Sequence, residues 1–165
     1  MVESDVEIRP YESSDREQVV ALWHECGLVV PWNDPHVDIT LKLQVQPELF
    51  LVGLVEGEVA ATAMAGYDGH RGWINYLGVS ARLRRRGIGR AMIQEVEQRL
   101  RRLGCPKINV QIRTSNRQAV AFYKKIGFNE EERVSMGKRL DGRQTLVERE
   151  AYGKKGGENC AWFGR

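Results

Sequence analysis

Along the first part of the chain, the spacing of apolar residues changes from a strand period to a helical period. Residues 6–11 alternate between apolar and polar side chains and predict a short strand. Residues 14–17, Ser-Asp-Arg-Glu, have the pattern of a capping box, and apolar residues then recur at helical spacing from Val19 to Cys26. Gly27 follows, so we expect an amphipathic helix that ends there.

The segment VDITLKLQV, residues 37–45, fits two periods. Its apolar and polar residues alternate, which favours a strand, but every fourth residue from Val37 is apolar, which also fits one face of a helix. Asp34 and Pro35 have the pattern of a helix cap and a first helical residue. The alternation favours a strand and the cap favours a helix, so both interpretations stay open.

Two apolar runs in the middle of the chain predict a β-hairpin. They occupy residues 49–55 and 59–65 and flank the turn-forming triplet Glu56-Gly57-Glu58. A glycine-rich loop is expected over residues 66–72, and the sequence WINYLGV, residues 73–79, predicts the next strand.

The second half of the chain alternates between helical and strand periods. Residues 89–103 have an apolar stripe and Glu–Arg pairs four residues apart, which predicts an amphipathic helix. Residues 107–113 alternate as a strand, and Ser115 or Asn116 is expected to cap a last helix. Residues 133–140 predict one more strand.

The order of these elements predicts a mixed α/β fold in a single domain over residues 1–141. The strand–helix–strand unit from residue 73 to residue 113 is expected to form a right-handed parallel crossover beside antiparallel strands. Residues 142–165 have little apolar periodicity, so we expect a C-terminal tail that is mobile or adds a peripheral strand.

The composition is that of an ordinary soluble globular protein, with 42% hydrophobic and 28% charged residues. A formal net charge of +3 gives no sign of a wholesale basic surface. No apolar run approaches the roughly 20 residues of a membrane span, and the acidic N-terminus has no secretory signal. Cys26, Cys105 and Cys160 have no disulfide or metal-ligand spacing, so we expect reduced thiols, no metal and a cytoplasmic location.

The stretch RLRRRGIGRAM, residues 82–92, places five arginines and two glycines between a predicted strand and a predicted helix. The first N–H groups of a helix lack main-chain partners and carry partial positive charge. Gly87 and Gly89 have no Cβ atom, so an anion can approach these groups, and the arginines add charge-assisted bonds to phosphate oxygens. A solvated basic turn is the alternative, but strand, glycines and helix together favour a pyrophosphate site.

Other phosphate-binding and nucleic-acid motifs fit this loop poorly. No Lys-Ser or Lys-Thr follows the glycines, as a Walker loop requires. A dinucleotide-binding fingerprint needs a third glycine at the position of Met92. A nucleic-acid surface would add interleaved aromatic residues or further basic faces, whereas Glu95 and Glu97 lie on the helix that follows.

Three motifs, in this order, resemble the GCN5-related N-acetyltransferase (GNAT) family. Arg84-Arg85-Arg86-Gly87-Ile88-Gly89 is similar to the family signature R/Q-x-x-G-x-G/A. YLGV, residues 76–79, resembles the preceding strand, and NRQAVAFYKKIGF, residues 116–128, resembles the following motif. The resemblance covers residues 6–140. The loops PWNDP and GYDGHRG are also similar to a bacterial YpeA-type subgroup, with Ala65 where that pattern has its first glycine.

The resemblance implies a mixed, mostly antiparallel central sheet with a splayed parallel strand pair and flanking helices, and acetyl-coenzyme A as cosubstrate. The main-chain N–H groups from Arg85 to Arg90 would hold the pyrophosphate. A bulge in the strand over residues 73–79 would open its edge to the pantetheine arm, which Asn116 would contact directly or through water. The implied cofactor-binding residues are Leu77, Val79, Arg84, Arg85, Arg86, Gly87, Ile88, Gly89, Arg90, Asn116 and Tyr123.

The resemblance also implies catalytic groups. The N–H of Val79 would face the thioester oxygen, and the hydroxyl of Tyr123 would point at the sulfur. A core aromatic is the alternative interpretation of Tyr123. The strand before the signature lacks the carboxylate that often serves as base in the family, so Asp68 and His70 on the neighbouring loop are candidate bases, with an ordered water as the alternative.

These residues imply an enzyme that moves an acetyl group from acetyl-coenzyme A directly to a primary amine in a ternary complex, without a cysteine intermediate. The amine would belong to a small molecule or a protein. A homodimer is compatible with the pattern, whereas a membrane or nucleic-acid partner is not favoured. The alternatives are a transferase for another short acyl group and a non-catalytic module that senses coenzyme A or contacts RNA.

Overall fold

The computed structural model of the protein describes residues 6–140. The chain divides into two compact units, Met1–Asn129 and Glu130–Arg165, and the helices and strands of the described residues all belong to the first unit. These elements are β1 (Glu7–Pro10), α1 (Arg16–Glu25), α2 (Pro35–Lys42), β2 (Phe50–Val55), β3 (Glu58–Tyr67), β4 (Gly72–Val79), α3 (Ile88–Arg102), β5 (Ile108–Val110) and α4 (Arg117–Lys125).

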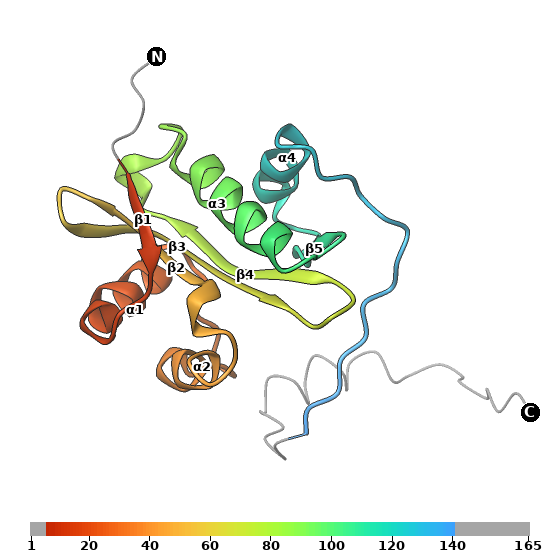
Figure 1. The fold of residues 1–165 in the computed structure, drawn as a ribbon, viewed down its shortest axis with the longest axis horizontal. Helices are drawn as coiled ribbons and strands as arrows, with labels where there is room; N and C mark the ends of the chain where they lie inside the picture. Colours follow the sequence, from red (N-terminus) through yellow and green to blue (C-terminus); the bar gives the residue numbers. More distant parts are fainter. Residues whose placement is uncertain (1–5, 141–165) are drawn as a thin grey trace, which may run out of the picture. The chain divides into compact units, whose positions relative to one another are not determined.

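The five strands form one sheet in the order β1-β2-β3-β4-β5 (Figure 1). Strands β1 to β4 pair antiparallel, and β5 pairs parallel to β4. The predicted hairpin of β2 and β3 turns at Glu56 and Gly57, whose positive φ angles of 53° and 80° suit the twist of a two-residue hairpin loop. The mixed sheet with flanking helices confirms the predicted fold class.

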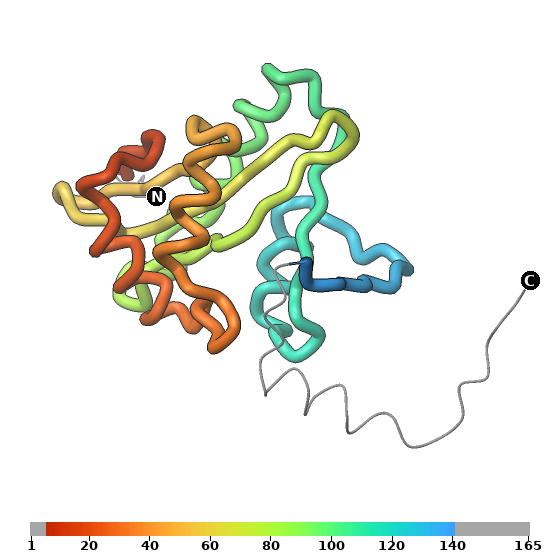
Figure 2. Tube along the Cα trace, turned by 90° about the horizontal axis from the view of Figure 1, so that it is seen from below, coloured from red at the N-terminus to blue at the C-terminus, as the bar shows by residue number. Residues whose placement is uncertain are grey.

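A separate hydrophobic core lies on each face of the sheet. Strand β2 shows the division, because Leu51 belongs to the core that contains Val96 of α3, whereas Phe50 and Val52 belong to the core that contains Trp23 of α1. The two-residue period of a strand places its neighbours on opposite faces. Figure 2 shows α1 and α2 side by side over one face of the sheet.

Helix α1 begins differently from the prediction. The Asp15 carboxylate accepts a hydrogen bond from the Glu12 N–H at 2.8 Å and forms an ion pair with Arg9 of β1 at 2.7 Å. The capping interaction therefore joins Glu12 to Asp15 and does not lie over residues 14–17. The ion pair with a strand is a tertiary contact, which a local motif does not reveal.

Residues of the ambiguous segment 37–45 form helix α2, so the cap decides between the two interpretations. The Asp34 carboxylate accepts hydrogen bonds from the first N–H groups of the helix at 2.9 and 3.4 Å. Ile39 is fully buried, whereas Val37 and Leu41 are 37% and 55% exposed. The predicted apolar face therefore points outward, and a different residue anchors the helix.

Two predicted boundaries move because strand pairing decides them. Strand β3 continues to Tyr67 and β4 begins at Gly72, where the two residues pair, so the expected loop over residues 66–72 shrinks to the turn at 68–71. The expected strand over residues 107–113 shortens to β5, since only this part pairs with β4.

In the second unit, residues 130–140 contain neither a helix nor a strand, so the predicted strand over residues 133–140 is wrong. Val134, Met136 and Leu140 are about nine-tenths exposed. Alternation produces a strand only where a neighbour supplies hydrogen bonds and a buried face, and the described residues of this unit supply neither. The expected tail, residues 142–165, lies outside the described residues.

Candidate functional site

Strand β4 carries a bulge near its centre. Thr62 of β3 pairs with Gly78, whereas Met64 pairs with Asn75, so β4 contains one more residue than β3 between these pairs. Tyr76 lies in the bulge with a φ of 51°, a left-handed conformation that is rare for a bulky residue. A bulge bends its strand, so the two halves of β4 run in different directions.

Strand β5 covers only the first part of the adjacent edge of β4, and the pairing ends at Ile74. The Ser80 N–H donates to the Ala60 carbonyl of β3 at 2.9 Å. Because main-chain groups alternate between the two sides of an antiparallel strand, those of Val79 point away from β3. The edge formed by Leu77 and Val79 therefore has no strand partner on the β5 side among residues 6–140.

Buried hydrogen bonds hold the bulge in place. The Trp23 Nε1 donates to the Thr62 hydroxyl at 2.9 Å, and that hydroxyl donates to the Tyr76 carbonyl at 2.8 Å. The Tyr76 ring also stacks on Trp23, with ring centroids 4.0 Å apart. Trp23 and Thr62 are fully buried. These contacts compensate for the unfavourable backbone conformation of Tyr76, and no periodic pattern in the sequence indicates them.

The arginine–glycine loop leads into α3 with unpaired main-chain donors. Gly87 precedes the helix with a φ of 85°, and Arg85 also has a positive φ, of 62°. The Ala91 N–H donates to the Gly87 carbonyl at 3.0 Å. In the described part of the chain, no group accepts a hydrogen bond from the main-chain N–H groups of Arg85 to Arg90. These donors and the helix dipole suit an anion.

The two glycines of the loop have different neighbours. A Cβ atom on Gly87 would meet nothing within 4 Å, so this glycine is needed for its backbone conformation. A Cβ atom on Gly89 would lie 3.4 Å from the ring of Phe122 and 3.6 Å from the Val79 side chain. Gly89 therefore faces α4 and β4 at ordinary van der Waals distance, which differs from the open approach expected for an anion.

The arginine side chains of the loop also differ. The Arg84 Nε donates to the Val79 carbonyl at 3.2 Å, so this side chain turns back toward β4. Ile88 is buried in the core and leaves only its main chain available. All five arginines of the loop are exposed, and among them Arg85, Arg86 and Arg90 flank the unpaired N–H groups.

Two of the predicted site residues lie at α4: Tyr123 is on the helix, and Asn116 precedes its first residue. Tyr123 is 8% exposed, and its ring packs edge-on against Phe122 and Phe128. Burial raises the pKa of the Tyr123 hydroxyl above its ordinary value, so the group stays protonated at neutral pH. The Asn116 side chain accepts from the Ala119 N–H at 3.1 Å, which confirms it as the cap of α4.

The structure does not bring Asp68 and His70 to Val79. Both lie in the turn before β4, and Val79 ends that strand, so about 20 Å of extended chain separates them. The Asp68 carboxylate accepts from the N–H groups of Arg71 at 2.7 Å and His70 at 2.8 Å, and from the Trp73 indole at 3.2 Å. These hydrogen bonds lower the pKa of Asp68 to about 2, which makes it a weak base.

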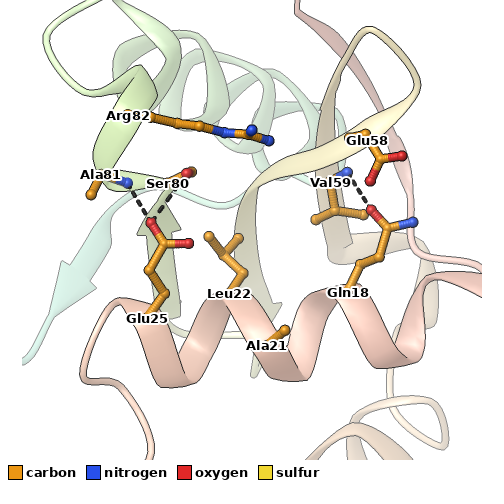
Figure 3. A pocket seen from close by; sticks show the side chains of 9 residues that line it. All are labelled: Gln18, Ala21, Leu22, Glu25, Glu58, Val59, Ser80, Ala81 and Arg82. Carbon is orange, nitrogen blue, oxygen red and sulfur yellow. Dashed lines mark hydrogen bonds between the residues drawn. The ribbon is translucent and has the colours of Figure 1, made fainter.

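A cavity of about 490 Å³ lies beside the start of the arginine–glycine loop (Figure 3). The Glu25 carboxylate accepts from the Ala81 N–H at 2.6 Å and the Ser80 hydroxyl at 3.1 Å. The Gln18 side chain accepts from the Val59 N–H at 2.8 Å on the other side of the cavity. The hydrogen bond from Ala81 is the main cause that lowers the pKa of Glu25. Helix α1 thus holds the loop where it leaves β4.

A second cavity, of about 410 Å³, lies beside the bulge of β4. The Tyr76 hydroxyl donates to the Asp38 carboxylate, and burial together with Asp38 raises the pKa of Tyr76 to about 12. The lining residues are Asn33, Asp38, Leu41, Lys42, Met64, Asn75 and Tyr76. Asp38 and Lys42 were not predicted from the sequence, because only the packing of α2 beside β3 and β4 brings them to this cavity.

The cysteines of the described residues are free thiols, as expected for Cys26 and Cys105. The Cys26 thiol donates to the Val79 carbonyl at 3.5 Å. Within residues 6–140, no group of three histidine, cysteine, aspartate or glutamate side chains is arranged to hold a metal ion. No helix in the same range combines the length and the apolar character that crossing a bilayer requires.

Comparisons with known proteins cover most of the chain. Residues 16–128 match the profile of the Acetyltransferase (GNAT) family. Two proteins named acetyltransferase, from Yersinia enterocolitica and Pectobacterium atrosepticum, are each 44% identical over 135 residues, which is 82% of this chain and 96% of theirs. The solved structure of AAC(6')-Iy with the bisubstrate analog CoA-S-monomethyl-acetylneamine has a TM-score of 0.69 at 19% identity and covers 82% of this chain and 99% of that one.

Proposed function

Because the chain belongs to the acetyltransferase (GNAT) family and is an acetyl-coenzyme A-dependent N-acetyltransferase, we propose that it passes the acetyl group directly to a primary amine in a ternary complex. The observation that carries this proposal is the uncovered edge of β4 next to the unpaired N–H groups that begin α3. The edge of β4 suits a thioester arm and the N–H groups suit a pyrophosphate. These two features are adjacent in the chain.

The coenzyme A binds along the loop and the strand edge. The N–H groups from Arg85 to Arg90 hold the pyrophosphate, and the exposed arginines add charge-assisted bonds to it. The pantetheine arm lies along the main chain of Leu77 and Val79. Asn116 contacts that arm through its amide nitrogen, since its oxygen caps α4.

Acetyl transfer needs a neutral amine. An amine with a pKa of about 10.4 is neutral in about one molecule in 2,500 at pH 7, which corresponds to about 4.6 kcal/mol. Its nitrogen attacks the thioester carbonyl carbon, a C–N bond forms, and the C–S bond breaks with its electron pair moving to sulfur. The amine proton leaves through water beside Asn75 and Tyr76, because Asp68 and His70 lie at the far end of β4.

Two groups of the chain assist this step. The Val79 N–H donates to the oxygen that becomes negative during the attack, and one such donor contributes about 3–4 kcal/mol. The Tyr123 hydroxyl donates a proton to the departing sulfur and regains one from the water that receives the amine proton. A thiolate with a pKa near 8.5 leaves partly unaided, so this proton accelerates the reaction without being indispensable.

Direct transfer is tested by kinetics. Initial rates of coenzyme A release are measured while the concentrations of both substrates are varied, and we expect the double-reciprocal plots to intersect. We also expect Cys26→Ser to keep its turnover. Parallel lines together with loss of turnover in Cys26→Ser would contradict the ternary complex. Reduced thiols at Cys26 and Cys105 also support a cytoplasmic location, which we include in the proposal.

The role of Tyr123 is tested by Tyr123→Phe, with Tyr11→Phe as the matched control in the opposite core. We expect kcat to fall about tenfold in Tyr123→Phe with an unchanged KM for acetyl-coenzyme A, because only the proton donor is lost. Tyr11→Phe should keep the wild-type kcat. Equal kcat values in both variants would assign Tyr123 to packing alone.

A further inference from the structure

The cavity beside the bulge carries two opposite charges that do not pair with each other. Asp38 and Lys42 are four residues apart on α2, a spacing at which opposite charges can form an ion pair. Neither forms one with any side chain in residues 6–140. Asp38 instead accepts from the Tyr76 hydroxyl, and the Lys42 ammonium donates to the Val45 carbonyl at 2.9 Å.

The Lys42 ammonium group is partly desolvated and has no ion-pair partner among residues 6–140. The side chain is half-buried, and this burial lowers the pKa of its ammonium group. The Val45 carbonyl uses one of three ammonium donors. The Lys42 nitrogen also lies 4.0 Å from the place where a Cβ on Gly66 would stand, which puts it against β3. The charge of Glu48 acts on Lys42 without forming an ion pair with it, so a carboxylate that enters the cavity would supply a direct counter-charge.

Asp38 is arranged to receive a cation at the other end of the cavity. Tyr76 occupies one carboxylate oxygen, and the other accepts no hydrogen bond from any described residue. Tyr76 stands directly before Leu77, the residue whose edge would carry the thioester arm. An ammonium or amine bound to Asp38 therefore lies beside the part of β4 where acetyl transfer is proposed.

On the basis of the proposed function, we propose that the acceptor is a free amino acid, whose amine binds Asp38 and whose carboxylate binds Lys42. Leu41 and Met64 line the same cavity, so we expect the site to prefer an amino acid with an apolar side chain. The cavity is an open depression of about 410 Å³, which leaves room for a small molecule. A polycationic acceptor is disfavoured, because its second ammonium would meet Lys42.

The test compares acceptors that share a side chain but differ in the carboxylate, and rates are compared per neutral amine because the carboxylate also affects the pKa of the amine. Release of coenzyme A is measured with leucine, leucinamide and isoamylamine, then with the other common amino acids and their amides. We expect kcat/KM for the best free amino acid to exceed that of its amide and its decarboxylated amine at least tenfold. Equal or better use of the amide, of isoamylamine or of a polyamine overturns the proposal. If no amine is acetylated, the proposed function fails as well.

Variants separate the two ends of the cavity. Lys42→Met should raise the KM for the amino acid about tenfold and bring the ratio between amino acid and amide close to one, while Lys42→Arg keeps that ratio. Asp38→Asn should weaken the binding of the amino acid and of its amide equally. Lys125→Met makes the same change on the exposed end of α4 and should leave the ratio unaltered. A ratio that survives in Lys42→Met overturns the proposal, because a merely structural lysine would not affect discrimination.

Discussion

At Tyr76 the backbone adopts a conformation that costs a bulky residue about 1–2 kcal/mol, and the surrounding side chains maintain it. Thr62 is central to this arrangement because its hydroxyl accepts from Trp23 and donates to the Tyr76 carbonyl at the same time. The residue that shapes the edge of β4 thus depends on partners distant in the sequence.

Replacing Thr62 with valine keeps the shape of the side chain and removes both hydrogen bonds. We expect Thr62→Val to lower the free energy of unfolding by about 2–4 kcal/mol, since two buried polar groups lose their partner. Thr40→Val is the matched control, because the Thr40 hydroxyl bonds to the His36 carbonyl on an exposed helix surface. Urea unfolding measures both, and equal stability of the two variants would contradict the role of Thr62.

The site residues divide into those that a local pattern predicts and those that only the fold brings together. The arginine–glycine loop is recognisable because strand, glycines and helix are consecutive in the chain. Asp38, Lys42 and Thr62 are not, since their significance comes from contacts with β3 and β4. Asp68 was predicted from local pattern as a base, but its carboxylate accepts hydrogen bonds from N–H groups of its own turn.

At the scale of elements, local pattern predicts structure where the period and the end signals agree. The β2–β3 hairpin and helix α3 were predicted to within a few residues, because a turn or a glycine marks their ends. Segment 37–45 had two periods, and its cap decided the outcome. The segment over residues 133–140 had a strand period but no partner strand in its described unit, so pattern alone was insufficient.

The start of α3 gives a prediction that separates backbone conformation from anion binding. Gly87 and Gly104 flank this helix with φ angles of 85° and 76°, and a Cβ on either would meet nothing within 4 Å. Alanine at either position should cost about 1 kcal/mol of stability. Only Gly87→Ala should weaken acetyl-coenzyme A binding, by about tenfold or more in calorimetry, because only this change moves the N–H groups of the loop.

The comparison of Gly87→Ala with Gly104→Ala is more selective than a substitution at Gly89. A large side chain at Gly89 would strike Phe122 and Val79, so loss of binding there would not be distinguishable from loss of packing. If Gly87→Ala and Gly104→Ala bind acetyl-coenzyme A equally well, the loop does not use its main-chain donors as proposed.

For the whole molecule, the distribution of charge decides between a cofactor site and a nucleic-acid surface. The net charge is only +3, and on α3 two arginines pair with glutamates one turn away, Arg99 with Glu95 at 2.8 Å and Arg101 with Glu97 at 3.0 Å. These pairs offset part of the positive charge of the helix, whereas the five arginines of the loop before it form no ion pair within residues 6–140. This pattern favours a compact anion over an extended polyanion.

Thermal unfolding tests whether the protein binds a compact anion or an extended polyanion, because a ligand stabilises only the folded state. At 100 times its Kd, acetyl-coenzyme A adds about 2.7 kcal/mol, which corresponds to a Tm rise of about 5–10 °C for a chain of this size. At the same concentration, S-acetylpantetheine should raise the Tm much less, because it keeps the thioester but lacks the diphosphate. A short single-stranded RNA should leave the Tm unchanged. An RNA-induced rise that disappears with salt, without a response to acetyl-coenzyme A, would instead assign the arginines to nucleic acid.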